Sequence, residues 1–408
     1  MMRYGNFIGN DGIIIDEIMA VYMPEGKSYT GKKQVEIYCH GGKHIVRLIQ
    51  DELIKDGARV AEPGEFTKMA FLAGRIDLTK AEAVAEVIAS NTSSSYKAAM
   101  EHLTGAYREH INMLRDQLID VIAETEASID YPEEEIDPVD NANMLRKVEN
   151  LKEQIRVLAE SYSGGRIINE GFKIAIGGRP NAGKSSLFNL LLKQERALVT
   201  PTPGTTRDYL SEWIDLDGYK VNLIDTAGLR KTGGVIEKEG QKSAKKIIDS
   251  SDLVIWLIDI TQKDWMKKLS EDKKTLTESD IMMIGNKIDL SEEKISLKNK
   301  KNDIDLLKIS CKTGKGITDL KKRIIEKIRS NLPDYTSGII VTSSRHKQKL
   351  YNASKNLEKA IQMLYKTETP ELIAFELRLA VNAIDEITGK IYNEDILGKI
   401  FSKFCIGK

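Results

Sequence analysis

The spacing of hydrophobic residues changes three times along the chain and divides it into four predicted parts. In residues 1–73, short apolar runs alternate with polar turns, and a helical spacing covers residues 45–55. The strands that these runs predict lie at 13–15, 18–23 and 35–40. The first part is therefore expected to be a small α+β domain.

Helical spacing dominates the second and fourth parts, residues 74–169 and 335–408. The expected helices cover residues 80–88, 103–129, 145–158, 345–365 and 370–397, and residues 161–165 are expected to form a linker. The simplest interpretation is one α-helical bundle whose two halves flank an inserted domain. The apolar stripes indicate packing between helices and no chemistry of their own.

Strand and helix signals alternate in the third part, residues 170–334, which predicts a mostly parallel sheet with helices on both faces. The expected strands lie at 172–177, 210–215, 220–225, 253–258, 281–285 and 306–310. The predicted fold class is thus multidomain, with an α+β N-terminal domain, an α-helical bundle and an inserted α/β domain.

The composition of the chain bears on whether it binds nucleic acid, enters a membrane or forms disulfides. The 408 residues include 61 basic and 61 acidic side chains, so the net charge is zero. Proteins that bind nucleic acid through bulk charge are usually basic, so a role on RNA has to rest on a local patch or on a partner. No apolar run reaches the roughly 20 residues of a membrane span, and the start does not resemble a signal peptide. The cysteines, at positions 39, 311 and 405, lie far apart, which argues against a disulfide scaffold and for a reducing cytoplasm.

The stretch from Gly178 to Ser186 reads Gly-Arg-Pro-Asn-Ala-Gly-Lys-Ser-Ser and fits the phosphate-binding pattern G-x-x-x-x-G-K-[ST]. An apolar strand precedes it and a helical run follows it, which is the context that the pattern needs. Its glycines let backbone N–H groups turn toward a phosphate, Lys184 is expected to reach the outer phosphates, and Ser185 is expected to ligate Mg²⁺. The residues expected to contact the nucleotide here are Asn181, Ala182, Gly183, Lys184, Ser185 and Ser186.

Three further motifs follow in order, each at the expected end of a strand: Asp225-Thr226-Ala227-Gly228, Asn286-Lys287-Ile288-Asp289 and Ser310-Cys311-Lys312. The first is expected to hold Mg²⁺ through water and to sense a γ-phosphate. Asp289 can accept hydrogen bonds from the N1–H and 2-amino groups of guanine, whereas adenine would leave its carboxylate unpaired. The four motifs together predict a Ras-like P-loop GTPase domain that binds GTP, and they disfavour an ATP-binding protein.

Residues 200–208 are expected to form a switch in which Thr205 or Thr206 ligates Mg²⁺. Leu229 stands where GTPases of the Ras type place a water-orienting glutamine. Leucine cannot orient water, so the chain is expected to offset the charge of the transition state in another way.

Several segments carry a resemblance to known families. Asn181 and the segments 204–208 and 225–230 resemble the potassium-activated GTPases of the translation-factor-related class. The terminal Cys405-Ile406-Gly407-Lys408 and the N-terminal segments 28–42 and 63–78 resemble one family within that class, the tRNA-modification GTPases called MnmE or TrmE. The resemblance extends over essentially the whole chain.

The resemblance implies a K⁺ site formed by Asn181 with Thr200, Thr202 and Thr205, and Mg²⁺ ligands at Ser185 and Thr206. The catalytic residues that it implies are Asn181, Lys184, Glu237 and Cys405. Glu237 would orient the attacking water, although on the residues alone it is a solvated switch residue. Cys405 would be a nucleophile or a redox group, and a small buried residue is an equally good interpretation.

The resemblance also implies a homodimer and a flavoprotein partner of the MnmG type, which together modify C5 of the wobble uridine of tRNA. The added group is aminomethyl or carboxymethylaminomethyl, and its one-carbon unit comes from a tetrahydrofolate that Glu36 and Arg75 would contact. Chains of this family begin earlier, with a glycine-containing strand. We therefore expect domain 1–73 to be incomplete, which puts folate binding and constitutive dimerisation in doubt.

Two other functions are compatible with a GTPase domain. A ribosome-assembly GTPase would bind rRNA as a switch, but the region after the GTPase domain contains no G-x-x-G loop of the KH type. A GTP-gated scaffold would bind GTP with negligible turnover. The wobble-uridine interpretation accounts for more of the motifs than either alternative.

Overall fold

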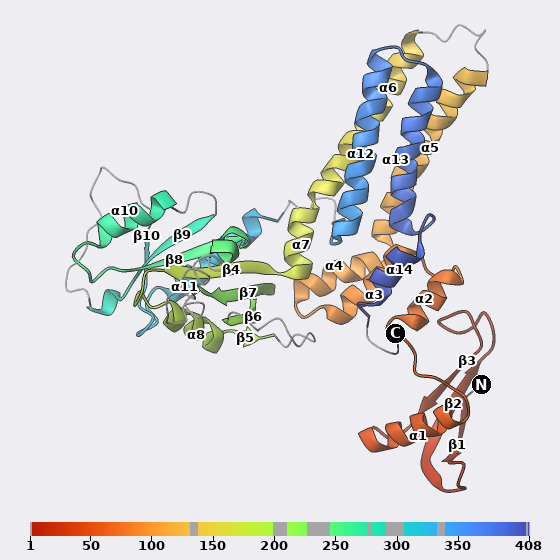
Figure 1. Cartoon of the computed structure of the whole chain (residues 1–408), viewed down its shortest axis with the longest axis horizontal. Coiled ribbons are helices and arrows are strands. Elements are labelled where there is room, and N and C mark those ends of the chain that lie inside the picture. The colour runs from red at the N-terminus through yellow and green to blue at the C-terminus, as the bar shows by residue number, and fades with distance from the viewer. Residues whose placement is uncertain are drawn as a thin grey trace, which may run out of the picture. The chain divides into compact units, whose positions relative to one another are not determined.

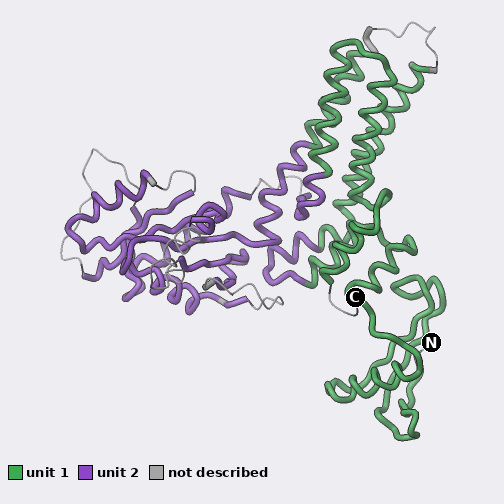
Figure 2. The backbone as a smooth tube through the Cα atoms, in the orientation of Figure 1, with its two compact units in different colours: residues 1–88, 100–155, 349–408 green, residues 89–99, 156–348 purple. Residues whose placement is uncertain are grey.

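The computed structural model describes residues 2–130, 138–198, 210–226, 245–275, 280–290, 306–332, 339–404 and 407. The chain forms two compact units (Figure 2). The first unit contains Met1–Ile88, Met100–Ile155 and Lys349–Lys408, and the second contains Ala89–Ala99 and Arg156–Gln348. Helices α4 (Ser93–Thr104), α6 (Pro138–Glu160) and α12 (Ser344–Tyr365) each contribute more than one turn to both units.

The first unit begins with an antiparallel sheet of order β1-β2-β3, formed by β1 (Met2–Ile8), β2 (Ile14–Met23) and β3 (Gln34–Tyr38). Helix α1 (Lys43–Lys55) packs on β2. The prediction of two strands at 13–15 and 18–23 was wrong, because the turn lies earlier, where the Gly9 N–H donates to the Ile13 carbonyl at 2.9 Å. Strand β1 was missed because nearly all of its residues face solvent.

The remaining helices of the first unit are α2 (Glu65–Leu72), α3 (Leu78–Ala89), α5 (Ala106–Asp130), α13 (Pro370–Thr388) and α14 (Glu394–Phe401). Helices α5 and α13 run side by side (Figure 1), and α14 packs against α2. Phe71 of α2, Leu78 of α3 and Phe401 of α14 lie together in one hydrophobic core.

Two helices predicted as continuous are interrupted by glycines with positive φ. The segment 103–129 divides at Gly105, with φ of 101°, into α4 and α5, and 370–397 divides at Gly389, with φ of 80°. A Cβ on Gly389 would lie 2.8 Å from the Cβ of Leu78, so close packing also requires glycine here. The prediction of a linker at 161–165 was wrong, because residues 162–165 begin helix α7 (Tyr162–Glu170).

The second unit is built on a seven-stranded sheet of order β10-β9-β8-β4-β7-β6-β5. The strands are β4 (Phe172–Gly178), β5 (Arg196–Ala197), β6 (Leu210–Leu216), β7 (Tyr219–Asp225), β8 (Leu253–Asp259), β9 (Ile281–Asn286) and β10 (Leu306–Lys308). The five strands from β10 to β7 are parallel, while β6 and β5 add an antiparallel edge. This confirms the mostly parallel sheet.

Helices cover both faces of this sheet. Ile174 and Ile176 of β4 pack against α8 (Lys184–Gln194) and α11 (Ile317–Ser330), whereas Ala175 between them packs against Ile247 on the other face. That second face also carries α10 (Trp265–Thr275), whose Leu269 is buried against β8 and β9. The predicted fold class, with an α+β N-terminal part, a helical part and a P-loop α/β part, is confirmed.

Candidate nucleotide-binding site

The phosphate loop joins the central strand β4 to helix α8, and it lies at the carboxyl end of that parallel strand. Gly178 has φ of 137°, and a Cβ there would clash with the Leu257 carbonyl. Gly183 has φ of 102°, and a Cβ there would clash with the side chain of Asn286. Both glycines of the motif are therefore required by the backbone and by the space around it.

Lys184 and Ser185 open helix α8 and face two different neighbours. Lys184 is 7% exposed, and its Nζ donates to the Arg179 carbonyl within the loop at 2.9 Å. The Ser185 hydroxyl donates to Oδ2 of Asp225 at 2.8 Å. An ammonium group and hard oxygen donors thus lie together at the amino end of a helix, which suits phosphate and a divalent cation.

The start of the Asp225-Thr226-Ala227-Gly228 motif contacts β4, the strand that leads into the phosphate loop. Asp225 is 1% exposed and ends β7, where it lies opposite Ile176 of β4. The Thr226 hydroxyl donates to the Ile176 carbonyl at 2.8 Å. These contacts hold the Asp225 carboxylate beside the first turn of α8.

The two predicted base-contacting loops follow β9 and β10, and Asn286 joins them to the phosphate loop. Its Nδ2 donates to the Ala182 carbonyl at 2.8 Å, and its Oδ1 accepts from the Cys311 N–H at 3.1 Å. The Ser310 hydroxyl donates to Oδ1 of Asp289 at 2.6 Å. The structure thereby brings together residues from three motifs that are far apart in sequence.

The Ser310 hydrogen bond is the main reason that the pKa of Asp289 is lowered, and the charges of Lys312 and Lys287 act in the same direction. Asp289 therefore stays ionised at neutral pH. Burial raises the pKa of the Cys311 thiol to about 11, so this thiol stays protonated and contributes packing rather than chemistry.

A carboxylate that the sequence analysis missed lies behind Lys287. Lys287 has φ of 71°, and its Nζ lies 2.7 Å from Oδ2 of Asp259, the last residue of β8. Burial alone would raise the pKa of Asp259, but hydrogen bonds from Lys287 and Thr261 outweigh it and lower that pKa. The sequence could have indicated Asp259 by its position, because it directly follows a predicted parallel strand beside the predicted site.

Other predicted site residues lie outside the residues that the structure describes: Thr200, Thr202, Thr205, Thr206, Ala227, Gly228, Glu237 and Cys405. Their proposed roles in Mg²⁺ binding, K⁺ binding and catalysis stay predictions. Ser186 lies exposed on the first turn of α8.

The two predicted folate contacts lie in the first unit. Glu36, on β3, accepts from the Tyr38 hydroxyl at 2.6 Å, and this bond raises the pKa of Tyr38. The Arg75 guanidinium donates to the Gly26 carbonyl at 2.8 Å and packs on Gly31. Within the described residues 2–130, the side chains of Glu36 and Arg75 form hydrogen bonds with separate partners and not with each other.

No helix among the described residues is long and apolar enough to cross a membrane. In the same residues, His, Cys, Asp and Glu side chains form no group of three that could hold a metal ion.

A glycine loop on the central strand, a carboxylate after the neighbouring strand and a base-contacting pair of loops define a P-loop protein of the GTPase class. A family model described as the MnmE helical domain matches residues 78–405, and one described as the GTP-binding protein TrmE N-terminus matches residues 1–75. The chain belongs to the MnmE (TrmE) family, as its motifs indicated.

Two curated relatives agree with this assignment. The tRNA modification GTPases MnmE of Finegoldia magna and Aquifex aeolicus are each 39% identical to the chain over its full length, which covers 89% and 90% of their own lengths. Among solved structures, the G domain of the T. maritima FeoB iron transporter is 28% identical. That match has a TM-score of 0.29 and covers 38% of this chain and 98% of the FeoB domain.

Proposed function

We propose that the chain is a K⁺-stimulated GTPase that acts in tRNA modification. It hydrolyses GTP to GDP and phosphate and, with an MnmG-type flavoprotein, adds an aminomethyl or carboxymethylaminomethyl group at C5 of the wobble uridine. The observation that carries the proposal is the position of Asn286, which bonds both the phosphate loop at Ala182 and the base loop at Cys311. One nucleotide can then contact all three loops at once.

The residues near the loop suit the two cations of the proposal. The Ser185 hydroxyl and the Asp225 carboxylate, 2.8 Å apart, are hard oxygen donors of the kind that Mg²⁺ prefers, and Mg²⁺ would supply charge against the phosphates. Asn181 is exposed, has φ of 61°, and makes no side-chain hydrogen bond to the residues that the structure describes. Its amide is therefore available as a K⁺ ligand, with Thr200, Thr202 and Thr205 as the further ligands of the proposal.

The rest of the proposal concerns partners and organisation. It includes a homodimer, a tetrahydrofolate at Glu36 and Arg75, catalytic roles for Glu237 and Cys405, and a cytoplasmic location. It divides the chain into domains 1–73, 74–169, 170–334 and 335–408. Membership of the family favours tRNA as the RNA partner over the rRNA that a ribosome-assembly GTPase would bind. A single-turnover measurement of GTP hydrolysis would distinguish an enzyme from a GTP-gated scaffold.

Potassium dependence is the first test. GTP hydrolysis is expected to be about tenfold or more faster in KCl than in NaCl at equal ionic strength, because a cation beside the phosphates offsets charge in the transition state. The Asn181→Ala variant is expected to lose this difference. Its matched control, Asn189→Ala, removes an exposed amide from α8 and should keep it. Equal rates in the two salts for the unaltered chain would rule out the potassium site.

The tRNA role is tested by nucleoside analysis. A strain that lacks this protein is expected to lose the modified wobble uridine from its tRNA. Supplying the 408-residue chain should restore it, whereas the Lys184→Ala variant should not. An unchanged nucleoside profile in the deletion strain would contradict the proposed pathway, and a loss of ribosomal subunits instead would favour the rRNA alternative.

A further inference from the structure

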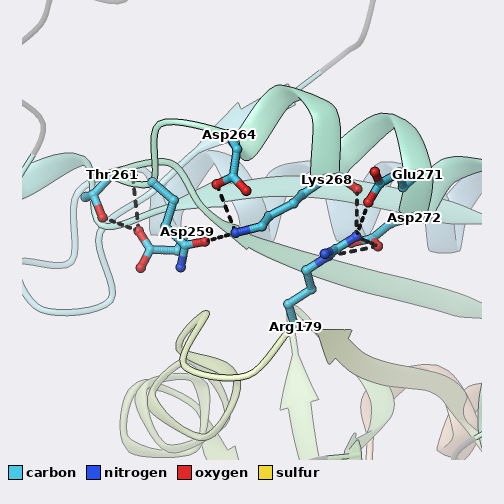
Figure 3. Close-up of polar contacts among 8 residues, drawn as sticks. Arg179, Asp259, Thr261, Asp264, Lys268, Glu271 and Asp272 are labelled. Carbon is cyan, nitrogen blue, oxygen red and sulfur yellow. Dashed lines mark hydrogen bonds and ion pairs between the residues drawn. The ribbon is translucent and has the colours of Figure 1, made fainter.

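Arg179, the second residue of the phosphate loop, directs its side chain toward helix α10 (Figure 3). Its Nε donates to both carboxylate oxygens of Asp272 at 3.0 and 3.1 Å, and its Nη2 donates to Oδ1 of Asp272 at 2.8 Å. Nη2 also donates to Oε2 of Glu271 at 3.0 Å. Such a forked guanidinium–carboxylate pair is among the stronger polar contacts in proteins.

Asp272 also accepts a hydrogen bond from strand β8. It is 8% exposed, and its Oδ2 accepts from Nε1 of Trp256 on β8 at 2.9 Å. The indole ring of Trp256 covers Gly177, where an added Cβ would lie 2.7 Å from the ring. Gly177, Trp256, Asp272 and Arg179 therefore form a closed ring of contacts around the start of the phosphate loop.

The main chain of Arg179 makes a contact separate from those of its side chain. Its carbonyl accepts from Nζ of Lys184, the residue expected to bind the outer phosphates. Because an ammonium group has three N–H donors, Lys184 can bind a phosphate while it keeps this carbonyl. The Lys184 bond joins the loop to the first turn of α8, whereas the Arg179 side chain joins the loop to α10.

We propose that Arg179, Asp272 and Trp256 are positioning residues that hold the phosphate loop in its binding shape and thereby set how long a guanine nucleotide stays bound. This inference rests on the proposed function, because it assumes that the loop binds GTP and GDP. A preformed loop loses less conformational entropy on binding than a loose one. Breaking the Arg179–Asp272 pair should loosen the loop and speed nucleotide release without altering the groups that perform hydrolysis.

The test uses the full-length chain and measures GDP release with radiolabelled nucleotide, affinity by calorimetry and hydrolysis at saturating GTP. Arg179→Gln and Asp272→Asn are each expected to speed GDP release and raise its Kd about tenfold, since each breaks a half-buried, forked charged pair. At saturating GTP, the rate of hydrolysis is expected to be unchanged in Asp272→Asn, whose altered side chain lies on α10 and outside the phosphate loop. Trp256→Phe keeps a ring over Gly177 but removes the N–H, so it should change release in the same direction by a smaller factor.

The matched control is Asp264→Asn. Asp264 lies on the loop before the same helix, and its exposed pair with Lys268, at 2.9 Å, contributes little. The double variant of Arg179 and Asp272 should release GDP no faster than the more affected single variant, because both changes break one interaction. A purely structural role would lower the melting temperature without changing GDP release.

Equal GDP release for Asp272→Asn and Asp264→Asn, or additive effects in the double variant, would overturn the inference. So would a loss of hydrolysis at saturating GTP with unchanged affinity. If Asp272→Asn does not fold, the same assays on Arg179→Gln and Trp256→Phe test whether these contacts control GDP release. If the unaltered chain binds no guanine nucleotide, the proposed function fails and this inference fails with it. If it binds and the variants bind equally well, only this inference fails.

Discussion

Replacing Lys184 with alanine is expected to abolish binding of GTP and GDP at micromolar concentrations. The ammonium group lies 7% exposed at the first turn of α8, where it donates to the Arg179 carbonyl. A phosphate oxygen at this position would gain a charge-assisted hydrogen bond worth about 1.5–3 kcal/mol. With contacts to two phosphates, the loss in affinity is expected to be about 10²–10⁴-fold.

Calorimetric titration with GDP would measure this loss. Lys193→Ala is a suitable control, because Lys193 lies exposed in the last turn of the same helix and should bind GDP as the unaltered chain does. Both variants should melt at similar temperatures, since alanine favours helix at either end. Retained GDP affinity in Lys184→Ala would mean that the loop does not bind phosphate.

Replacing Asp289 with asparagine is expected to change the preferred base from guanine to xanthine. The carboxylate can accept from the N1–H and 2-amino groups of guanine, whereas an amide places a donor where the 2-amino group donates and suits the 2-oxo group of xanthine. The affinity for GTP should fall about 10²-fold or more, because a donor is left without an acceptor in the site.

The lowered pKa of Asp289 adds a pH dependence to this prediction. A carboxyl group with a depressed pKa stays ionised until the pH falls below that lowered value, so guanine selectivity should be constant across neutral pH. Ser310→Ala removes the main cause of the shift and should make selectivity decline at a higher pH than in the unaltered chain.

Comparing the Kd values of GTP and XTP tests the assignment of Asp289. Asp280→Asn makes the same chemical change just before β9, where the exposed Asp280 pairs with Lys327 at 2.8 Å. This control should keep its preference for GTP. An Asp289→Asn variant that still prefers GTP to XTP by the original factor would show that another residue selects the base.

Among the strands that the structure describes in the second unit, all except the two-residue β5 were predicted to within two residues at either end. Buried parallel strands such as β4 and β8 were found because they appear as continuous apolar runs. Strand β1 lacks such a signal, since its side chains are nearly all exposed. The helical stripes continued across Gly105 and Gly389, so the hydrophobic pattern alone could not locate the two breaks. Gly165 was misinterpreted as part of a linker, although a Cβ there would clash with the Val341 carbonyl and the glycine serves close packing.

The motif residues of the site could be found because their spacing is set by the strands that carry them. Asp225, Asn286 and Asp289 all lie at or just after the carboxyl ends of predicted strands. The pair of Arg179 and Asp272 could not be found in this way. Asp272 lies on a helix rich in charged residues, and nothing in the sequence distinguishes it from its neighbours before the chain folds.

All three tryptophans of the chain, Trp213, Trp256 and Trp265, lie in the second unit. Intrinsic fluorescence excited selectively at indole therefore reports on the nucleotide-binding unit alone, while the first unit stays optically silent. Trp256 is the fluorophore hydrogen-bonded to Asp272 at 2.9 Å. A difference spectrum between the unaltered chain and Trp256→Phe would thus isolate an internal, label-free probe at the start of the phosphate loop.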